Sequence, residues 1–483
     1  MQLPYGNRPK VGGGNKQSQT SEKNRDKSQA RRPNVAVLGA GFGGLWAART
    51  LADSPVNVLL IDRHNYHTFF PLLYQVAAAE VEPEDITQPL RKIFWKRPNV
   101  RFFLGEVQGV DLSAKVVRIP DREIRYDYLV IALGSKPNFY GVPGLAEHSF
   151  TLKSLEQGIA LRNQILTCFE RAACEEDAEL QQAWLTFSIV GGGPTGVEFA
   201  GTLMELIRGS LDKDFPGLDF KQVRILLLEA SDHLLNGMPK ELSEYTQKRL
   251  GKMGVEVHLK SQLVKITPRE VLLKDGTRIA SRTVIWTAGV RGNIPGDQWG
   301  LATNRQNQVE VLPTLQVPDH PEVYVVGDLA GIQQDGHPLP MVAQMGIQTG
   351  ATAGRNILRQ AAGQPPLPFR YHDTGTLDVI GRNAAVAYIW RRAFQGFPAW
   401  LIWVWVHIFN LIGYRNRFLV MINWAWDYFF SEHSVRLIVP TEIHTGNEPI
   451  ATEIPDKADM LVGMDAPKDA VKEVAFPNKQ NQG

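Results

Sequence analysis

The chain has 483 residues, of which 43% are apolar and 21% charged, values typical of globular proteins, and its length suits about three domains. A formal net charge of +2 gives no reason to expect a nucleic-acid or an acidic partner. The two cysteines, Cys168 and Cys174, are too few for a disulfide scaffold, an iron–sulfur cluster or a Cys-x-x-Cys pair, so we expect a reducing compartment and redox chemistry on organic cofactors.

Both ends of the chain are expected to be disordered tails. Residues 1–33 are basic and contain no apolar run, which excludes the apolar core of a secretory signal. Their positive charge leaves contact with an anionic membrane surface as an alternative. Residues 441–483 scatter Pro, Asp, Glu and Lys among few large apolar side chains and are expected to form the second disordered tail.

The first structured stretch is an apolar run, Val35–Leu38, that leads directly into a glycine-rich turn and then into a helical segment, Leu45–Ala52. The turn carries the pattern G-x-G-x-x-G at Gly39, Gly41 and Gly44. The first glycine allows a tight turn, the second lets the backbone approach a pyrophosphate, and the third lets the helix pack on the strand. This stretch, the first fingerprint, predicts a dinucleotide site.

The segments that follow complete this prediction. The apolar run Val56–Ile61 ends in Asp62, which is about where a carboxylate should meet the ribose hydroxyls. The mixed aromatic and polar segment Arg63–Gln75 fits neither periodicity and is expected to be a loop. It contains His64 and His67, but no pattern of Cys or carboxylates completes a metal site around them, so we expect no metal.

A second copy of the same design begins after the run Tyr128–Gly134, a buried strand closed by Gly134, which should lie near the first dinucleotide. The run Phe187–Val190 enters a second G-x-G-x-x-G, formed by three glycines, and a helix follows at Val197–Ile207. The glycines of this second fingerprint are Gly191, Gly193 and Gly196. We therefore expect a second dinucleotide.

The acid of the second fingerprint is Glu229, which ends the run Val223–Leu228 after a polar insertion at Arg208–Lys221. A carboxylate there accepts hydrogen bonds from a free ribose 2′-OH and repels a 2′-phosphate, so it favours NADH over NADPH. The unit closes at Gly289. A flavin and a nicotinamide are the simplest pair of dinucleotides to expect, because hydride passes between their rings and protein thiols are not needed.

Two later segments carry polar residues that could contact a cofactor or a second flat ligand. The strand Glu322–Val326 ends in Gly327 and Asp328, an acid placed to bond the ribityl or phosphate part of a cofactor, unless it is a plain turn residue. Its position predicts that the chain returns to finish the first site. Further on, Gln344 and Gln348 share one face of a helix of small residues, where they could bond carbonyl oxygens of a flat ligand or simply be solvated.

The C-terminal part is rich in tryptophan. The run Ala399–Gly413 has no formal charge, and after the basic turn Tyr414–Arg417 comes a second apolar run, Phe418–Phe430. The first run is short for a transmembrane helix, which takes about 20 residues. Tryptophans around a basic turn are typical of two short helices that lie in a membrane surface. A buried core helix or a dimer interface is the alternative.

Taken together, these motifs resemble one family, the type II (non-pumping) NADH:quinone oxidoreductases, which have a two-dinucleotide flavoprotein fold. The resemblance covers about residues 34–440 and is carried by five motifs, Gly39-Ala40-Gly41-Phe42-Gly43-Gly44, Phe70-Pro71-Leu72-Leu73-Tyr74-Gln75, Gly191-Gly192-Gly193-Pro194-Thr195-Gly196-Val197-Glu198, Ala343-Gln344-x-x-x-Gln348 and Gly381-Arg382. Two positions depart from the family pattern. Gly346 replaces the usual Ala, which could loosen the quinone pocket, and Leu133 replaces a common threonine near the flavin.

The resemblance implies non-covalent FAD at the first fingerprint, Gly43 included, NADH at the second, and quinone at Gln344 and Gln348. It also implies that Glu198 points toward the junction of nicotinamide and flavin, where it would organise that junction or relay a proton, unless it only complements the helix dipole. Residues 399–430 would hold the protein to the cytoplasmic face of a membrane. We also expect a homodimer, and no coupling of electron transfer to proton pumping.

The expected fold is α/β, with one Rossmann-like domain inserted in another and a C-terminal membrane-anchoring helical module. The expected boundaries are 34–150 and 315–375 for the FAD-binding domain, 151–314 for the NADH-binding domain and 376–440 for the anchor. Three alternatives stay open. They are a sulfide:quinone oxidoreductase, which needs redox cysteines beside the flavin, a soluble NADH oxidase, and an NADH-binding redox sensor without turnover.

Overall fold

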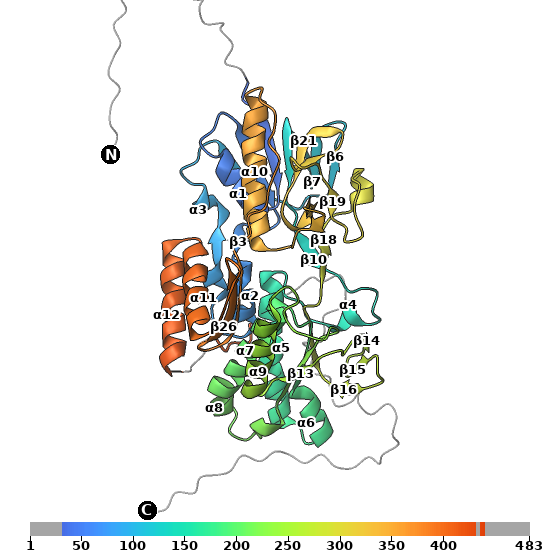
Figure 1. Cartoon of the computed structure of the whole chain (residues 1–483), viewed down its shortest axis with the longest axis vertical. Coiled ribbons are helices and arrows are strands. Elements are labelled where there is room, and N and C mark those ends of the chain that lie inside the picture. The colour runs from blue at the N-terminus through green and yellow to red at the C-terminus, as the bar shows by residue number, and fades with distance from the viewer. Residues whose placement is uncertain (1–30, 431–434, 440–483) are drawn as a thin grey trace, which may run out of the picture.

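A six-stranded sheet forms the centre of the first unit in the computed structural model, which describes residues 31–430 and 435–439 (Figure 1). Its spatial order is β20 (Gln316–Val317), β21 (His320–Val325), β9 (Tyr128–Ile131), β1 (Asn34–Leu38), β2 (Asn57–Asp62) and β5 (Val100–Leu104). All neighbours from β21 to β5 pair in parallel. The tails predicted at 1–33 and 441–483 lie outside the described residues, apart from residues 31–33.

A second, four-stranded parallel sheet lies between β9 and β21 in the sequence. Its order is β13 (Glu256–His258), β12 (Arg224–Leu228), β11 (Thr186–Val190) and β17 (Thr283–Trp286). Because β21 pairs with β9, the chain returns to the first sheet after building the second. The two passages between the units pair with each other as β10 (Ser135–Pro137) and β18 (Val290–Gly292).

Helix α1 (Phe42–Leu51) packs against helix α10 (Ala343–Ala361), far away in sequence (Figure 1). Glycines on α10 make this contact close. A Cβ at Gly350 would lie 2.1 Å from the carbonyl oxygen of Gly43, and one at Gly346 would lie 2.9 Å from Phe42 Cβ. Gly346 therefore keeps α10 close to α1, and it also lines the cavity described below.

The segment Arg63–Gln75, expected to be a loop, contains regular structure. Strand β3 (Tyr66–Thr68) pairs with β4 (Thr87–Pro89), and helix α2 (Leu73–Ala77) follows. The expectation was wrong because burial decides the conformation here: all five residues of α2 are buried. A short helix buried on every side shows no helical periodicity in its sequence.

The C-terminal part is a three-stranded antiparallel sheet covered by two helices (Figure 1). The elements are β25 (Thr376–Gly381), β26 (Ala384–Ile389), β27 (Arg392–Gly396), α11 (Phe397–Asn410) and α12 (Tyr414–Phe430). Helix α11 packs on β26 through buried Ala399 and Trp403. No helix among the described residues is both long enough and apolar enough to cross a membrane.

The remaining elements surround these layers. Their helices are α3 (Leu90–Ile93), α4 (Leu145–His148), α5 (Leu155–Cys174), α6 (Ala178–Trp184), α7 (Pro194–Leu206), α8 (Asp212–Asp214) and α9 (Lys240–Met253). Their strands are β6 (Gly109–Asp111), β7 (Val116–Ile119), β8 (Arg122–Arg125), β14 (Leu263–Ile266), β15 (Glu270–Leu273), β16 (Arg278–Ala280), β19 (Val309–Glu310), β22 (Ala330–Gly331), β23 (Gln333–Gln334) and β24 (His337–Pro338).

Candidate functional site

A cavity of about 560 Å³ lies at the carboxyl ends of β1, β2, β9 and β21. Ligands of open parallel sheets bind at this edge. Most of the residues predicted for the first dinucleotide line the cavity, together with one predicted catalytic residue. They are Gly39, Gly41, Gly43, Asp62, Gly134, Gly327, Asp328 and Glu198.

The first fingerprint has the geometry that a dinucleotide requires. Gly39 has a φ of +93°, and a Cβ there would lie 2.4 Å from the carbonyl oxygen of Ala132. A Cβ at Gly44 would lie 1.8 Å from the carbonyl oxygen of Gly39, so the start of α1 rests on the turn itself. Nothing lies within 4 Å of a Cβ placed on Gly41, and the backbone there faces open space. The turn therefore fits a pyrophosphate beside the N-terminus of α1.

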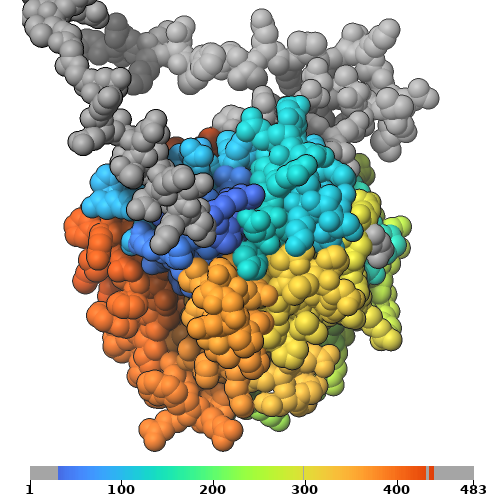
Figure 2. Space-filling model, turned by 90° about the horizontal axis from the view of Figure 1, so that it is seen from above, coloured from blue at the N-terminus to red at the C-terminus, as the bar shows by residue number. Residues whose placement is uncertain are grey.

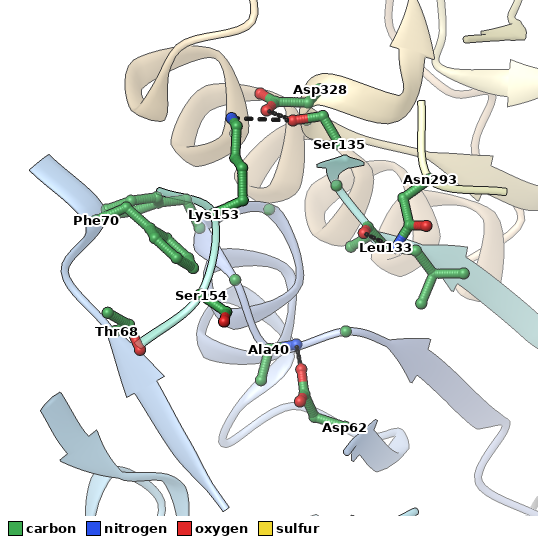
Figure 3. Close-up of a pocket in the computed structure, with 18 of the residues that line it drawn as sticks. Ala40, Asp62, Thr68, Phe70, Leu133, Ser135, Lys153, Ser154, Asn293 and Asp328 are labelled. Carbon is green, nitrogen blue, oxygen red and sulfur yellow. Dashed lines mark hydrogen bonds between the residues drawn. The ribbon is translucent and has the colours of Figure 1, made fainter. Parts of the chain in front are cut away.

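Asp62 ties this turn to the end of β2. Its Oδ2 accepts a hydrogen bond from the Ala40 backbone N–H at 2.6 Å (Figure 3). Its Oδ1 accepts one from the His64 N–H at 2.8 Å. The Nδ1 of His67 lies 2.8 Å from the Ala40 carbonyl oxygen. Burial lowers the pKa of His67 to about 4, so its ring is neutral at physiological pH.

The second fingerprint has the same pair of backbone-to-carboxylate hydrogen bonds as the first. Glu229 accepts hydrogen bonds from the N–H groups of Gly192 at 2.6 Å and Ser231 at 2.8 Å. A Cβ at Gly196 would lie 1.9 Å from the carbonyl oxygen of Gly191, whereas one at Gly193 would meet nothing within 4 Å. Glu229 thus occupies the position that Asp62 holds in the first unit, despite its longer sequence spacing. Gly289 follows β17, at the same edge of the sheet.

A polar group on the far wall of the cavity includes one residue that the sequence did not indicate. Ser135 Oγ donates to Asp328 Oδ2 at 2.6 Å, and Lys153 Nζ lies 3.3 Å from Ser135 Oγ (Figure 3). Burial lowers the pKa of Lys153, and the nearby Asp328 carboxylate raises it. Lys153 lies in a connection without a motif, so no sequence signal could have found it.

Glu198 enters the cavity from α7, in the second unit, and is buried. Burial raises its pKa well above the ordinary value, and the nearby carboxylate of Asp378 on β25 raises it further. A backbone hydrogen bond from Val379 acts in the opposite direction. Burial also raises the pKa of Asp378 to about 7. Two acids that share an apolar interior in this way hold protons near neutral pH.

The other end of the cavity is apolar. It is lined by Phe70, Pro71, Leu73, Tyr74, Met341, Val342 and Ala343. Phe70 is 39% exposed and Val342 is 40% exposed, so two of these apolar lining residues are also in contact with solvent.

The two predicted quinone-site glutamines do not line this cavity. Gln348 donates through Nε2 to the His372 carbonyl at 2.9 Å and accepts through Oε1 from the His372 N–H at 3.0 Å. Its amide therefore holds the segment that leads to β25. Gln344, on the same helix, is half-buried, and its neighbour Ala343 is the residue that lines the cavity.

Neither cysteine is among the residues that line the cavity. Cys168 is buried in α5, where its Sγ lies 3.2 Å from Thr283 Oγ1, and Cys174 is exposed. The redox cysteines that the sulfide:quinone alternative requires are thus missing from this cavity. Within residues 31–430 and 435–439, no group of three or more His, Cys, Asp or Glu could hold a metal ion.

Comparison with known proteins agrees with this geometry. The family model of pyridine nucleotide-disulphide oxidoreductases matches residues 33–350. A type II NADH:quinone oxidoreductase of Mycobacterium tuberculosis is 36% identical over 82% of this chain and 88% of its own length. A type II NADH:quinone oxidoreductase of Haemophilus influenzae is 29% identical over 74% of this chain and 87% of its own length.

Two solved structures share the fold at 18% identity. NDH2 from Plasmodium falciparum in complex with NADH has a TM-score of 0.77 and covers 85% of this chain and 100% of its own. The sulfide:quinone oxidoreductase of Aquifex aeolicus has a TM-score of 0.65 and covers 83% of this chain and 96% of its own. The fold, the two fingerprints and the similarity to the mycobacterial enzyme lead to one conclusion. The chain is a pyridine nucleotide-disulphide oxidoreductase and belongs to the type II NADH:quinone oxidoreductases.

Proposed function

We propose that the cavity binds FAD without a covalent bond and that electrons pass there from NADH to a membrane quinone, without proton pumping. The observation that carries this proposal is the composition of the cavity wall. The first fingerprint forms one part, Glu198 arrives from the NADH-type unit, and an apolar end includes Phe70 and Val342, which are also in contact with solvent. Bound FAD supplies the chemistry, because its ring accepts a hydride from NADH and gives two electrons to a quinone.

The residues around the first fingerprint would bind and orient the cofactor. The N-terminus of α1 beside Gly41 would take the pyrophosphate, and Asp62 would take the ribose. Ser135, Lys153 and Asp328 form the polar wall opposite and would bind the chain between the rings. Gly134 and Gly327 keep the backbone close to the cofactor.

Glu198 would hold the proton that the reaction needs. NADH, one proton and a quinone give NAD⁺ and a quinol, so one proton must come from water. A buried carboxyl with a raised pKa carries a proton at neutral pH and can deliver it inside a cavity. This supports a role for Glu198 in proton transfer over a purely structural one.

The quinone would enter at the apolar end of the cavity. Exposed Phe70 and Val342 flank that end, and Ala343 lines it from the start of α10. Gln344 would bond the quinone carbonyl from the same helix. Gln348 would act through His372, because its amide already binds that backbone.

Narrowing the apolar end tests this assignment. In Val342→Trp, NADH should still bleach the flavin in stopped-flow mixing, whereas recovery with a short-chain quinone should slow by about tenfold or more. Leu312→Trp, at an exposed site away from the cavity, is the matched control and should change neither step. If the flavin were reoxidised by quinone at equal rates in both variants, the quinone would not bind at this end of the cavity. A chain that bleaches with NADH but never turns over would instead be the redox sensor.

The second fingerprint would take NADH, with Gly191, Gly193 and Gly196 around the pyrophosphate and Glu229 at the ribose. Glu229→Ala removes both the acceptor for the 2′-OH and the repulsion of a 2′-phosphate. We expect kcat/KM to fall about tenfold for NADH and to rise for NADPH. Asp232→Asn removes a neighbouring exposed acid and should leave the ratio unchanged. If the ratio of kcat/KM for NADH to kcat/KM for NADPH were the same in Glu229→Ala as in wild type, Glu229 would not contact the ribose.

Helices α11 and α12 would attach the protein to a membrane surface. Their outer face carries large apolar side chains, among them Trp405, which is 73% exposed. The other exposed members are Phe397, Leu401, Phe409, Phe418, Met421, Ile422, Trp426, Phe429 and Phe430. Attachment at the cytoplasmic face and a homodimer stay predictions. Sedimentation of the detergent-solubilised holoenzyme tests the homodimer.

A further inference from the structure

We propose that a basic and aromatic rim beside the start of α12 binds the headgroups of anionic lipids. The rim consists of Lys92, Trp95 and Lys96, near α3, and of Tyr414 and Arg415, at the start of α12. It belongs to the first unit as much as to the C-terminal helices. The proposal rests on the membrane attachment proposed above and extends its contact area beyond residues 399–430.

The side chains of the rim project into solvent without apolar neighbours to cover them. Trp95 is 75% exposed and Tyr414 is 87% exposed. Lys92, Lys96 and Arg415 are exposed as well, and Lys96 Nζ lies 4.9 Å from the centre of the Trp95 ring. Tryptophan and tyrosine flanked by lysine and arginine are the residues enriched where proteins meet lipid headgroups.

Hydrogen bonds connect the two halves of the rim. The side chain of Asn416 donates to the Thr87 carbonyl at 2.7 Å and to the carbonyls of Glu84 and Asp85. Thr87 begins β4, and α3 follows directly after β4. Ile93 of α3 and Ile412 of the turn before α12 pack against the same core cluster. The α3 segment and the start of α12 are thus fixed relative to each other.

The figures show the same proximity. In Figure 1, α3 lies just beyond the end of the α11–α12 pair, and in Figure 2 the light-blue segment borders the orange and red of the C-terminal helices. The exposed apolar face of α12 starts next to the rim, with Phe418 one turn beyond Tyr414. One continuous surface therefore carries apolar side chains along α12 and positive charges at its start.

The two lysine charges of the rim are available to a ligand, whereas Arg415 lies near the Asp85 carboxylate, whose pKa burial raises and the Arg415 charge lowers. The segment Arg91–Arg97 has four basic residues and no acid. Arg97 pairs with Asp53, and Arg91 lies over the Phe102 ring, whereas neither lysine makes an ion pair within the described ranges. Of the nearby acids, Asp85 accepts a hydrogen bond from Asn423, and Glu84 is exposed. The rim thus has a net positive charge, which matches anionic headgroups.

Vesicle binding by the holoenzyme tests the rim. The probes are vesicles of phosphatidylcholine and vesicles of equal parts phosphatidylcholine and phosphatidylglycerol, separated by sedimentation. Each lysine near an anionic surface is worth about fivefold in affinity at moderate salt. Lys92→Ala with Lys96→Ala should therefore weaken binding to the anionic vesicles by about 30-fold. Its binding to the neutral vesicles should stay unchanged.

A matched control has the same charge change and the same spacing at another site. Lys248→Ala with Lys252→Ala removes two exposed lysines from α9, in the second unit, and should change anionic binding less than about twofold. Equal losses in both double variants, or no loss in either, would overturn the rim while leaving attachment through α11 and α12 intact. A wild type that bound neither kind of vesicle would overturn the attachment itself, and the rim with it.

Discussion

Gly44→Ala should yield a protein that fails to retain FAD and is strongly destabilised. A Cβ at this position would lie 1.8 Å from the carbonyl oxygen of Gly39 and 3.3 Å from the Cβ of Ala132, and neither atom can turn away by a side-chain rotation. Overpacking of this kind costs about 3 kcal/mol or more, and the turn that binds the pyrophosphate must open. The flavin absorbance of the purified protein and its thermal unfolding measure both effects.

Gly41→Ala separates stability from cofactor binding. Nothing in the protein lies within 4 Å of a Cβ at Gly41, so the fold should tolerate the methyl group. The methyl group would stand where the pyrophosphate approaches, so the dissociation constant of FAD should rise about tenfold while the unfolding of the FAD-free protein stays near that of wild type. If the two variants lost FAD and stability in equal measure, the turn would not be the cofactor cradle.

Asp378→Asn should stabilise the protein at alkaline pH and leave it unchanged at acidic pH. Burial raises the pKa of Asp378 to about 7 in the fold, whereas an unfolded Asp titrates near pKa 3.9. Between these values the folded protein keeps a proton that the unfolded chain releases, so the wild type loses stability as the pH rises from about 4 to about 7. Asparagine does not titrate, so the free energy of unfolding of the variant should exceed that of wild type by up to about 4 kcal/mol at pH 8.

The melting temperature of the holoenzyme between about pH 4 and pH 8 measures this effect. Asp212→Asn removes an exposed acid on α8 and should leave the pH dependence of wild type intact. The Oδ2 of Asp378 has no hydrogen-bond partner, so the amide breaks no bond there, and any cost of burying its N–H groups is the same at every pH and separates from the pH-dependent gain. Destabilisation by the same amount at every pH would show that the ionisation of Asp378 does not cost the fold stability.

The parts of the site that are local in sequence could be predicted. Gly39, Gly44 and Asp62 meet within one consecutive strand–turn–helix–strand unit, so spacing alone places them. The same holds for Gly191, Gly196 and Glu229, even with the insertion before β12. Family resemblance added the FAD and NADH assignments, which spacing could not distinguish.

The parts that the sequence did not indicate depend on contacts between distant segments. Lys153 reaches Ser135 and Asp328 across three separate connections, and no pattern marks it. Asp378 acts on Glu198 only because β25 packs against α7. Gln348 was assigned to the quinone site by family resemblance, and the bonds of its amide to the His372 backbone could not be read from its helical face.

The matching hydrogen bonds of Asp62 and Glu229 have a consequence for residence times. Each acid accepts one backbone hydrogen bond at each oxygen and keeps further lone pairs with which it can accept from a ribose. This contact is alike at the two sites, so it cannot by itself make one dinucleotide stay and the other leave. The difference must come from what surrounds each turn: α1 packs on α10, whose Gly346 also lines the cavity, whereas α7 packs on β25, α2 and α9. The partners of the two helices, and not the fingerprints, therefore distinguish the two sites.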